Sequence, residues 1–93
     1  YLPIDKSDRK REIKALERIS KDRGQSQIFI ETPYRNGKMI DDLKASLSPS
    51  TRLCIAADIS LSTEYIKTHT IQEWSKIKPE LHKRPAIFII HKD

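Results

Sequence analysis

Two short polar segments hold the side chains in this sequence that are best suited to chemistry. The first places a carboxylate, an aromatic ring and a guanidinium directly after an apolar run: Glu31-Thr32-Pro33-Tyr34-Arg35. The second follows another apolar run and includes Asp58, Ser60 and Glu64. Carboxylates can accept a proton or orient a substrate, and a guanidinium can bind a carboxylate or a phosphate. Each segment also has a structural explanation, the first as an ion pair that fixes a turn and the second as an ordinary polar loop.

A strand, a helix and a second strand are predicted around these segments. Residues 27–30 and 52–57 are short apolar runs, typical of strands buried on both faces. Between them, over about residues 37–47, apolar side chains recur at helical spacing. Such a unit has parallel strands joined by a right-handed crossover. If the two strands are near neighbours, both polar segments lie at the same edge of the sheet, where α/β folds bind their ligands.

The predicted flanking elements begin and end at recognisable signals. A first helix is expected from a cap at Ser7 or Asp8 to about residue 23, with Gly24 as its stop signal. A half-exposed strand is expected at 65–69, where polar and apolar residues alternate. It leads into a third helix that opens with the capping box Thr70-Ile71-Gln72-Glu73.

The last apolar run, residues 86–90, is the most apolar of the chain and is expected at the centre of the sheet. These elements predict one α/β domain over residues 1–93, with a mixed sheet of four or five strands flanked by about three helices. No apolar run approaches the roughly 20 residues of a membrane span, so no membrane association is expected. A single cysteine, which cannot form an internal disulfide, favours the cytoplasm.

The predicted first helix is rich in charge. Residues 5–23 hold eight basic and five acidic side chains, in a chain of net charge +5. Lys10, Lys14 and Lys21 lie away from the predicted core and are candidates for nucleic-acid binding. Because acids are interleaved with them, a solvated face with a Glu17–Lys21 ion pair is the favoured interpretation. The histidines and the cysteine share no ligand spacing, so no metal site is expected.

The sequence resembles the carboxyl half of the tetrapyrrole-methylase superfamily of S-adenosylmethionine-dependent methyltransferases. Within it, the nearest branch methylates ribose 2′-hydroxyls of small-subunit ribosomal RNA. The resemblance begins with Tyr1-Leu2-Pro3 before a basic helix. It continues with Phe29-Ile30-Glu31-Thr32-Pro33-Tyr34-Arg35, which matches the family at its glutamate, proline and arginine. The second polar segment stands where the family has Glu-Leu-Thr-Lys-x-His-Glu, with Leu61 in place of the lysine and Thr63 in place of the histidine.

The resemblance implies that residues 1–93 are the second domain of a two-domain enzyme, usually a homodimer. S-adenosylmethionine would lie between this domain and an amino-terminal domain with a Gly-rich loop, so the isolated chain is expected to be inactive. The implied catalytic residue is unknown. The implied lining of the cofactor or substrate cleft is Glu31, Thr32, Pro33, Tyr34, Arg35, Asp58, Ser60 and Glu64.

The implied acceptor is RNA, with a role in rRNA processing, but Leu61 in place of the family lysine leaves a corrin or porphyrin precursor open. Arg35 would hold Glu31 or an RNA phosphate, Tyr34 would stack on a base or on adenine, and Asp58 or Glu64 would orient the substrate. Two alternatives come from other classes. One is a non-enzymatic basic α/β module that binds nucleic acid, and the other is a structural dimerisation domain.

Overall fold

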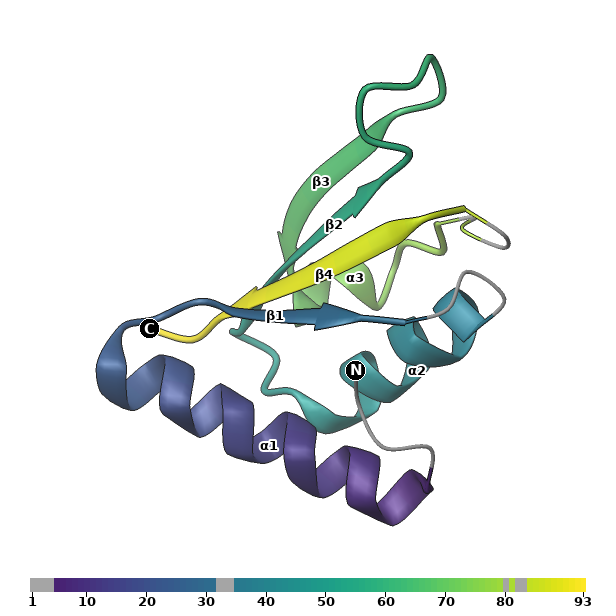
Figure 1. Ribbon diagram of the computed structural model, residues 1–93. Helices are drawn as coiled ribbons and strands as arrows, with labels where there is room; N and C mark the ends of the chain where they lie inside the picture. The colour runs from purple at the N-terminus through teal and green to yellow at the C-terminus, as the bar shows by residue number, and fades with distance from the viewer. Residues whose placement is uncertain (1–4, 32–34, 80, 82–83) are drawn as a thin grey trace.

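The chain forms a single sheet with helices packed against it (Figure 1). The computed structural model describes residues 5–31, 35–79, 81 and 84–93. Over these residues it has four strands and three helices, which confirms the predicted α/β class. In chain order the elements are α1 (Lys6–Arg23), β1 (Gln27–Ile30), α2 (Asn36–Ser46), β2 (Arg52–Ala57), β3 (Tyr65–Thr70), α3 (Ile71–Trp74) and β4 (Ala86–His91).

The strand order is β1-β4-β2-β3, and every neighbouring pair is antiparallel. The prediction of a mixed sheet with parallel β1 and β2 as a pair is therefore wrong. The two strands do point the same way, but β4 lies between them. Its central place was predicted from its apolar sequence, and its Phe88 and Ile90 are completely buried. No fifth strand occurs in the described ranges.

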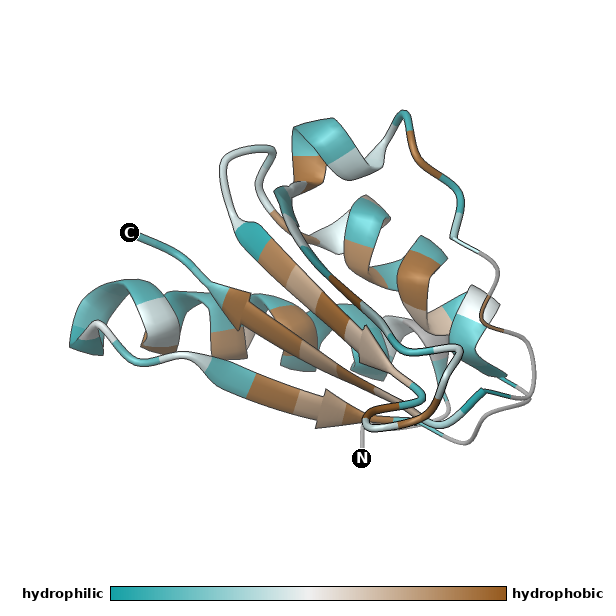
Figure 2. Cartoon of the chain, turned by 90° about the horizontal axis from the view of Figure 1, so that it is seen from above, coloured by the Kyte–Doolittle hydropathy of each residue, from teal (hydrophilic) through white to brown (hydrophobic). Residues whose placement is uncertain are grey.

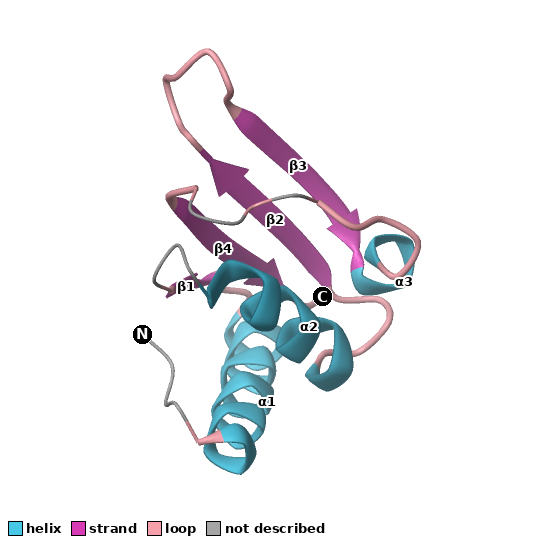
Figure 3. Cartoon of the chain, turned by 90° about the vertical axis from the view of Figure 1, so that its right-hand side faces the viewer, coloured by secondary structure: helices cyan, strands magenta, loops and turns pink. Residues whose placement is uncertain are grey.

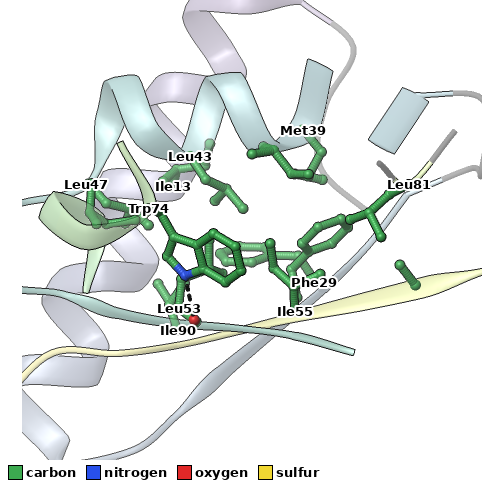
Figure 4. Packing of buried hydrophobic residues seen from close by; sticks show 14 of the residues in the cluster. Ile13, Phe29, Met39, Leu43, Leu47, Leu53, Ile55, Trp74, Leu81 and Ile90 are labelled. Atoms are coloured by element: carbon green, nitrogen blue, oxygen red, sulfur yellow. Dashed lines mark hydrogen bonds between the residues drawn. The ribbon is translucent and has the colours of Figure 1, made fainter. Parts of the chain in front are cut away.

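Helices α1 and α2 lie on the same side of the sheet, and the core fills the space between helices and strands (Figure 3). Trp74 is completely buried in this core, and its indole N–H donates to the Leu53 carbonyl oxygen at 2.8 Å (Figure 4). A buried indole needs such a partner. The capping box predicted at the start of α3 is confirmed, with Thr70 and Glu73 each accepting from the other's backbone N–H.

Helix α1 begins two or three residues earlier than its sequence suggested. Its cap is Asp5, which accepts from the backbone N–H of Asp8 at 3.1 Å, in place of the predicted Ser7 or Asp8. The helix ends as predicted at Gly24, whose φ of 61° is a left-handed conformation that glycine adopts without strain. Both ends of α1 are thus fixed by contacts within a few residues.

The face of the sheet away from α1 and α2 carries exposed apolar side chains. The apolar residues of the strands are coloured brown in Figure 2. Strand β1 was expected to be buried on both faces, but it lies at the edge of the sheet, with Ile28 64% and Ile30 44% exposed. Directly paired residues of neighbouring strands point to the same face. The register therefore groups five isoleucines on this side, which we call the open face: Ile28, Ile30, Ile66, Ile87 and Ile89. None of the described helices is long and apolar enough to cross a membrane.

Candidate functional site

A pocket of about 520 Å³ brings the two polar segments together at one end of the sheet. It lies between the end of β1, the end of β2 and the start of β4. Both Glu31 and Asp58 contribute to its wall, although the strands that carry them are not neighbours. We call it the strand-end pocket, and its lining is Ile30, Glu31, Ala56, Asp58, Ile59, Leu61, Pro85, Ala86 and Ile87.

Glu31 is held by a buried arginine from α1. Arg9 is 1% exposed, and its Nη1 lies 3.0 Å from a Glu31 oxygen. Its Nε lies 2.8 Å from an oxygen of Asp42 on α2, so one guanidinium joins three parts of the chain. Buried charges are tolerated when they are paired in this way. The cation that pairs with Glu31 is therefore Arg9, where the sequence had suggested Arg35.

The signal for Arg9 was present in the sequence but was obscured by the surrounding charges. Arg9 lies four residues before Ile13, so the two side chains share the buried stripe of α1. Ser20, seven residues after Ile13 on the same helix, is also completely buried. A basic residue at a core position requires an acidic partner, which is the argument that would have led to Glu31.

Asp58 is fixed on the opposite side of the pocket. It is buried, and one of its oxygens lies 2.7 Å from Nε of Arg84 and accepts from the Thr63 hydroxyl at 2.9 Å. Its backbone N–H donates to the Pro85 carbonyl oxygen at 2.9 Å. The Arg84 hydrogen bond, followed by that of Thr63, lowers the pKa of Asp58 below its ordinary value. Asp58 is therefore ionised at neutral pH and is better suited to binding than to taking a proton.

Ser60 and Glu64 belong to the same loop but face solvent. The Glu64 carboxylate accepts from the backbone N–H of Ser60 at 2.8 Å, and both residues are exposed. Neither is part of the pocket lining, so the structure gives them a role within the loop. Asp58 and Ser60 have positive φ angles of 50° and 70°, which are uncommon for residues other than glycine. The fold of this loop leaves Ile59 and Leu61 at the pocket with more than half of each exposed.

The remaining predicted residues have separate places. Thr32, Pro33 and Tyr34 lie outside the described residues. Arg35 is half-buried and immediately precedes α2. Lys10, Lys14 and Lys21 are exposed on α1, and two of them line a different hollow, far from the strand-end pocket. No cluster of three or more potential metal ligands occurs in the described part of the chain.

The chemistry of the strand-end pocket follows from its lining. Seven of the nine residues are apolar and two are carboxylates. Among the described residues that line it there is no lysine or arginine, because Arg9 and Arg84 contact the carboxylates from outside the lining. Such a wall suits a ligand with an apolar body and cationic or hydrogen-bond-donating groups. It does not suit a phosphate.

Comparisons with known proteins agree with the fold. No family model matches the chain, and no curated protein sequence matches it. Among solved structures, it is similar to the methyltransferase CobJ, with a TM-score of 0.51 and 14% sequence identity. The similarity covers 87% of this chain and 34% of that one, so the chain spans about a third of the CobJ structure. At this identity the likeness concerns the fold alone.

Proposed function

We propose that this chain is a domain of an S-adenosylmethionine-dependent methyltransferase and that the strand-end pocket forms one wall of its cofactor and substrate cleft. The observation that carries the proposal is the meeting of two segments at this pocket. The end of β1 and the 58–64 loop are two of the places where the sequence resembles such methyltransferases, and both line the same cavity. The fold likeness to the methyltransferase CobJ supports the same function.

The lining of the pocket fits this cofactor. S-adenosylmethionine combines apolar parts with a sulfonium and an ammonium group, and an apolar wall with two carboxylates complements both features. Bound there, it would supply an already activated methyl group, so the protein mainly has to align the acceptor and exclude water. Arg9 and Arg84 hold the carboxylates in place while the isoleucines and Leu61 exclude water.

The motif at the end of β1 supports a ribose 2′-hydroxyl of ribosomal RNA as the acceptor, in a cytoplasmic homodimer. The remaining wall of the cleft, including the Gly-rich loop, would come from residues outside this chain. Consistent with that, the chain matches about a third of the CobJ structure. The 93 residues alone are accordingly expected to be inactive.

One observation favours a second acceptor. Leu61, which takes the place of the family lysine, is 59% exposed at the pocket and makes its wall apolar. An apolar wall without a described cation is better suited to the flat ring system of a corrin or porphyrin precursor than to an RNA phosphate. A labelled methyl group on S-adenosylmethionine distinguishes the two acceptors. Its transfer to small-subunit ribosomal RNA and to a tetrapyrrole precursor is measured in parallel.

The proposal is tested by calorimetric titration of the complete protein with S-adenosylhomocysteine, the product form of the cofactor. Leu61→Asp places a charge in the apolar wall and is expected to weaken binding by about tenfold, equivalent to about 1.4 kcal/mol. The matched control is Ile66→Asp, because Ile66 is similarly exposed on the open face but outside the pocket. It is expected to change affinity less than about twofold. Absence of binding to the wild-type protein, or equal losses in both variants, would contradict the proposal.

A further inference from the structure

We propose that a second site, on α1 at the far end of β4, binds the phosphodiester backbone of RNA. The site is a hollow of about 370 Å³, which we call the basic groove, lined by Lys14, Glu17, Arg18, Lys21, Asp22, Ser48 and Lys92. It joins α1, the connection from α2 to β2 and the end of the chain. The strand-end pocket lies at the other end of β4, about 20 Å away by the rise of a six-residue strand.

The position of Glu17 changes the charge balance of α1. The interleaved acids were the reason to regard this helix as an ordinary solvated face. In the structure Glu17 is 8% exposed, and its carboxylate accepts from the backbone N–H of Ser48 at 2.8 Å and from the Thr51 hydroxyl. The prediction of a Glu17–Lys21 ion pair on the surface is therefore wrong, because the hydrogen-bond donors to Glu17 come from the α2–β2 connection. The negative charge of the Glu17 carboxylate therefore faces inward, where hydrogen bonds stabilise it.

Lys92 adds a cation that the sequence of α1 does not reveal. Its backbone N–H donates to the hydroxyl of the buried Ser20 at 2.9 Å, which fixes the end of the chain against α1. Its ammonium group donates to the Ser50 hydroxyl at 2.5 Å, so the side chain is placed next to the α2–β2 connection. The groove thus presents four cationic side chains, and of its two carboxylates only that of Asp22 is exposed.

The arrangement of the cations indicates the class of ligand. Lys14, Arg18 and Lys21 follow each other at helical spacing and form a row about 10 Å long, which is enough to contact more than one phosphate. No aromatic or apolar side chain is among the described residues of the groove, so it has no platform for base stacking and no surface for a lipid layer. Cations without base-reading groups bind the backbone in a sequence-independent, salt-sensitive way.

This inference rests on the proposed function only in its choice of RNA. It assigns RNA anchoring to the basic groove and leaves the strand-end pocket to the methyl donor and the reacting group. Because the groove is tested by binding without any methyl donor, its failure is distinguishable from failure of the methyltransferase proposal. A protein that binds S-adenosylhomocysteine but not RNA would overturn the groove and leave the pocket standing.

The test measures binding of a fluorescent 12-nucleotide uridine RNA to the complete protein at several salt concentrations. Replacing Lys14, Arg18, Lys21 and Lys92 by glutamine is expected to weaken binding at least about tenfold at low salt and to reduce the slope of log affinity against log salt by about 2 to 3. The matched control replaces four exposed lysines outside the groove: Lys38, Lys67, Lys76 and Lys78. It has the same net charge and is expected to lose less than about threefold.

A single substitution keeps the test decisive if the fourfold variant is unstable. Lys92→Gln alone is expected to reduce the salt slope by about 0.7, the contribution of one phosphate contact to a single strand. Equal losses in the groove and control variants would show that net charge alone attracts RNA, and would overturn the site. Wild-type protein without measurable RNA affinity would overturn it as well.

Discussion

Arg9 is the most deeply buried charge among the described residues, and its guanidinium meets carboxylates from two different elements. Its placement explains how Glu31 can occupy a pocket wall while 7% exposed. A carboxylate in such surroundings needs a cation within hydrogen-bond distance, and Arg9 supplies it from α1. Asp42 in turn holds the same guanidinium at 2.8 Å, so the three charges form one unit. The position of Glu31 at the pocket therefore depends on residues that do not line it.

Replacing Arg9 by methionine is expected to destabilise the protein by roughly 3–5 kcal/mol, because Glu31 and Asp42 would remain buried without their cation. Urea unfolding of the complete protein measures the change. The control is Arg11→Met, since the Arg11 side chain is 78% exposed and pairs with Asp8 only at 3.5 Å. It is expected to cost about 0.5 kcal/mol or less.

The combination Arg9→Met, Glu31→Gln and Asp42→Asn is expected to recover part of the loss, because it removes the uncompensated charges as well as the cation. If Arg9→Met were as mild as Arg11→Met, the buried unit would not be energetically important. The assignment of Arg9 as the residue that positions Glu31 would then fail.

At the scale of elements, the loop between β2 and β3 is held to the start of β4 by Asp58. Arg84 and Pro85 both contact this residue, one through its side chain and the other through its backbone carbonyl. The loop carries the exposed Ile59 and Leu61, which complete the apolar wall of the strand-end pocket. The shape of that wall therefore depends on the contacts of Asp58 with Arg84 and Pro85 at the end of the sheet.

The ion pair between Asp58 and Arg84 predicts a dependence of stability on pH. Because Arg84 and Thr63 lower the pKa of Asp58, the folded protein binds this proton less readily than the unfolded chain does. The stabilisation is fully present above the unfolded pKa of about 3.9 and is lost as pH falls through the lower folded pKa. In urea unfolding, the stability advantage of wild type over Asp58→Asn should shrink as pH falls from about 6 to about 3.

Asp41→Asn is a suitable control, because Asp41 is an exposed carboxylate on α2. Its difference from wild type should stay small and nearly constant over the same pH range. A pH-independent difference between wild type and Asp58→Asn would show that the ion pair does not hold the loop.

The elements that sequence predicted well are those determined by local contacts. The end of α1 at Gly24 and the capping box of α3 depend on residues within a few positions of each other. Strand pairing depends on distant segments, so the insertion of β4 between β1 and β2 was not predicted from the intervening helix. An apolar run at an edge strand looks the same in sequence as one at the centre, which is why the exposure of Ile28 was missed.

The same distinction holds for the candidate site. The common location of Glu31 and Asp58 was predicted because both follow strands that point the same way. Their partners Arg9 and Arg84 lie 22 and 26 residues away along the chain, in segments that showed no sign of contact. Lys92 reaches α1 from 72 residues beyond Ser20, so the basic groove could be found only in the folded chain.

The molecule as a whole has two chemically different ends. An apolar pocket with two carboxylates lies at one end of β4, and a groove with four cations lies at the other. The open face, which includes part of the pocket wall, exposes isoleucines of the sheet, within a body of 37 × 27 × 23 Å. Our two proposals place the methyl donor at the apolar end and RNA anchoring at the basic end. Both assignments place ligands on surfaces that lie outside the hydrophobic core.

Hydrogen–deuterium exchange of the complete protein, with and without S-adenosylhomocysteine, tests the central claim most directly. If the strand-end pocket is a wall of the cofactor cleft, the ligand should slow exchange in peptides that cover residues 58–64 and 85–87. Peptides from the basic groove, residues 14–22, should be unchanged. The claim would be contradicted if saturating ligand slowed exchange only in other parts of the protein and left residues 58–64 and 85–87 unaffected.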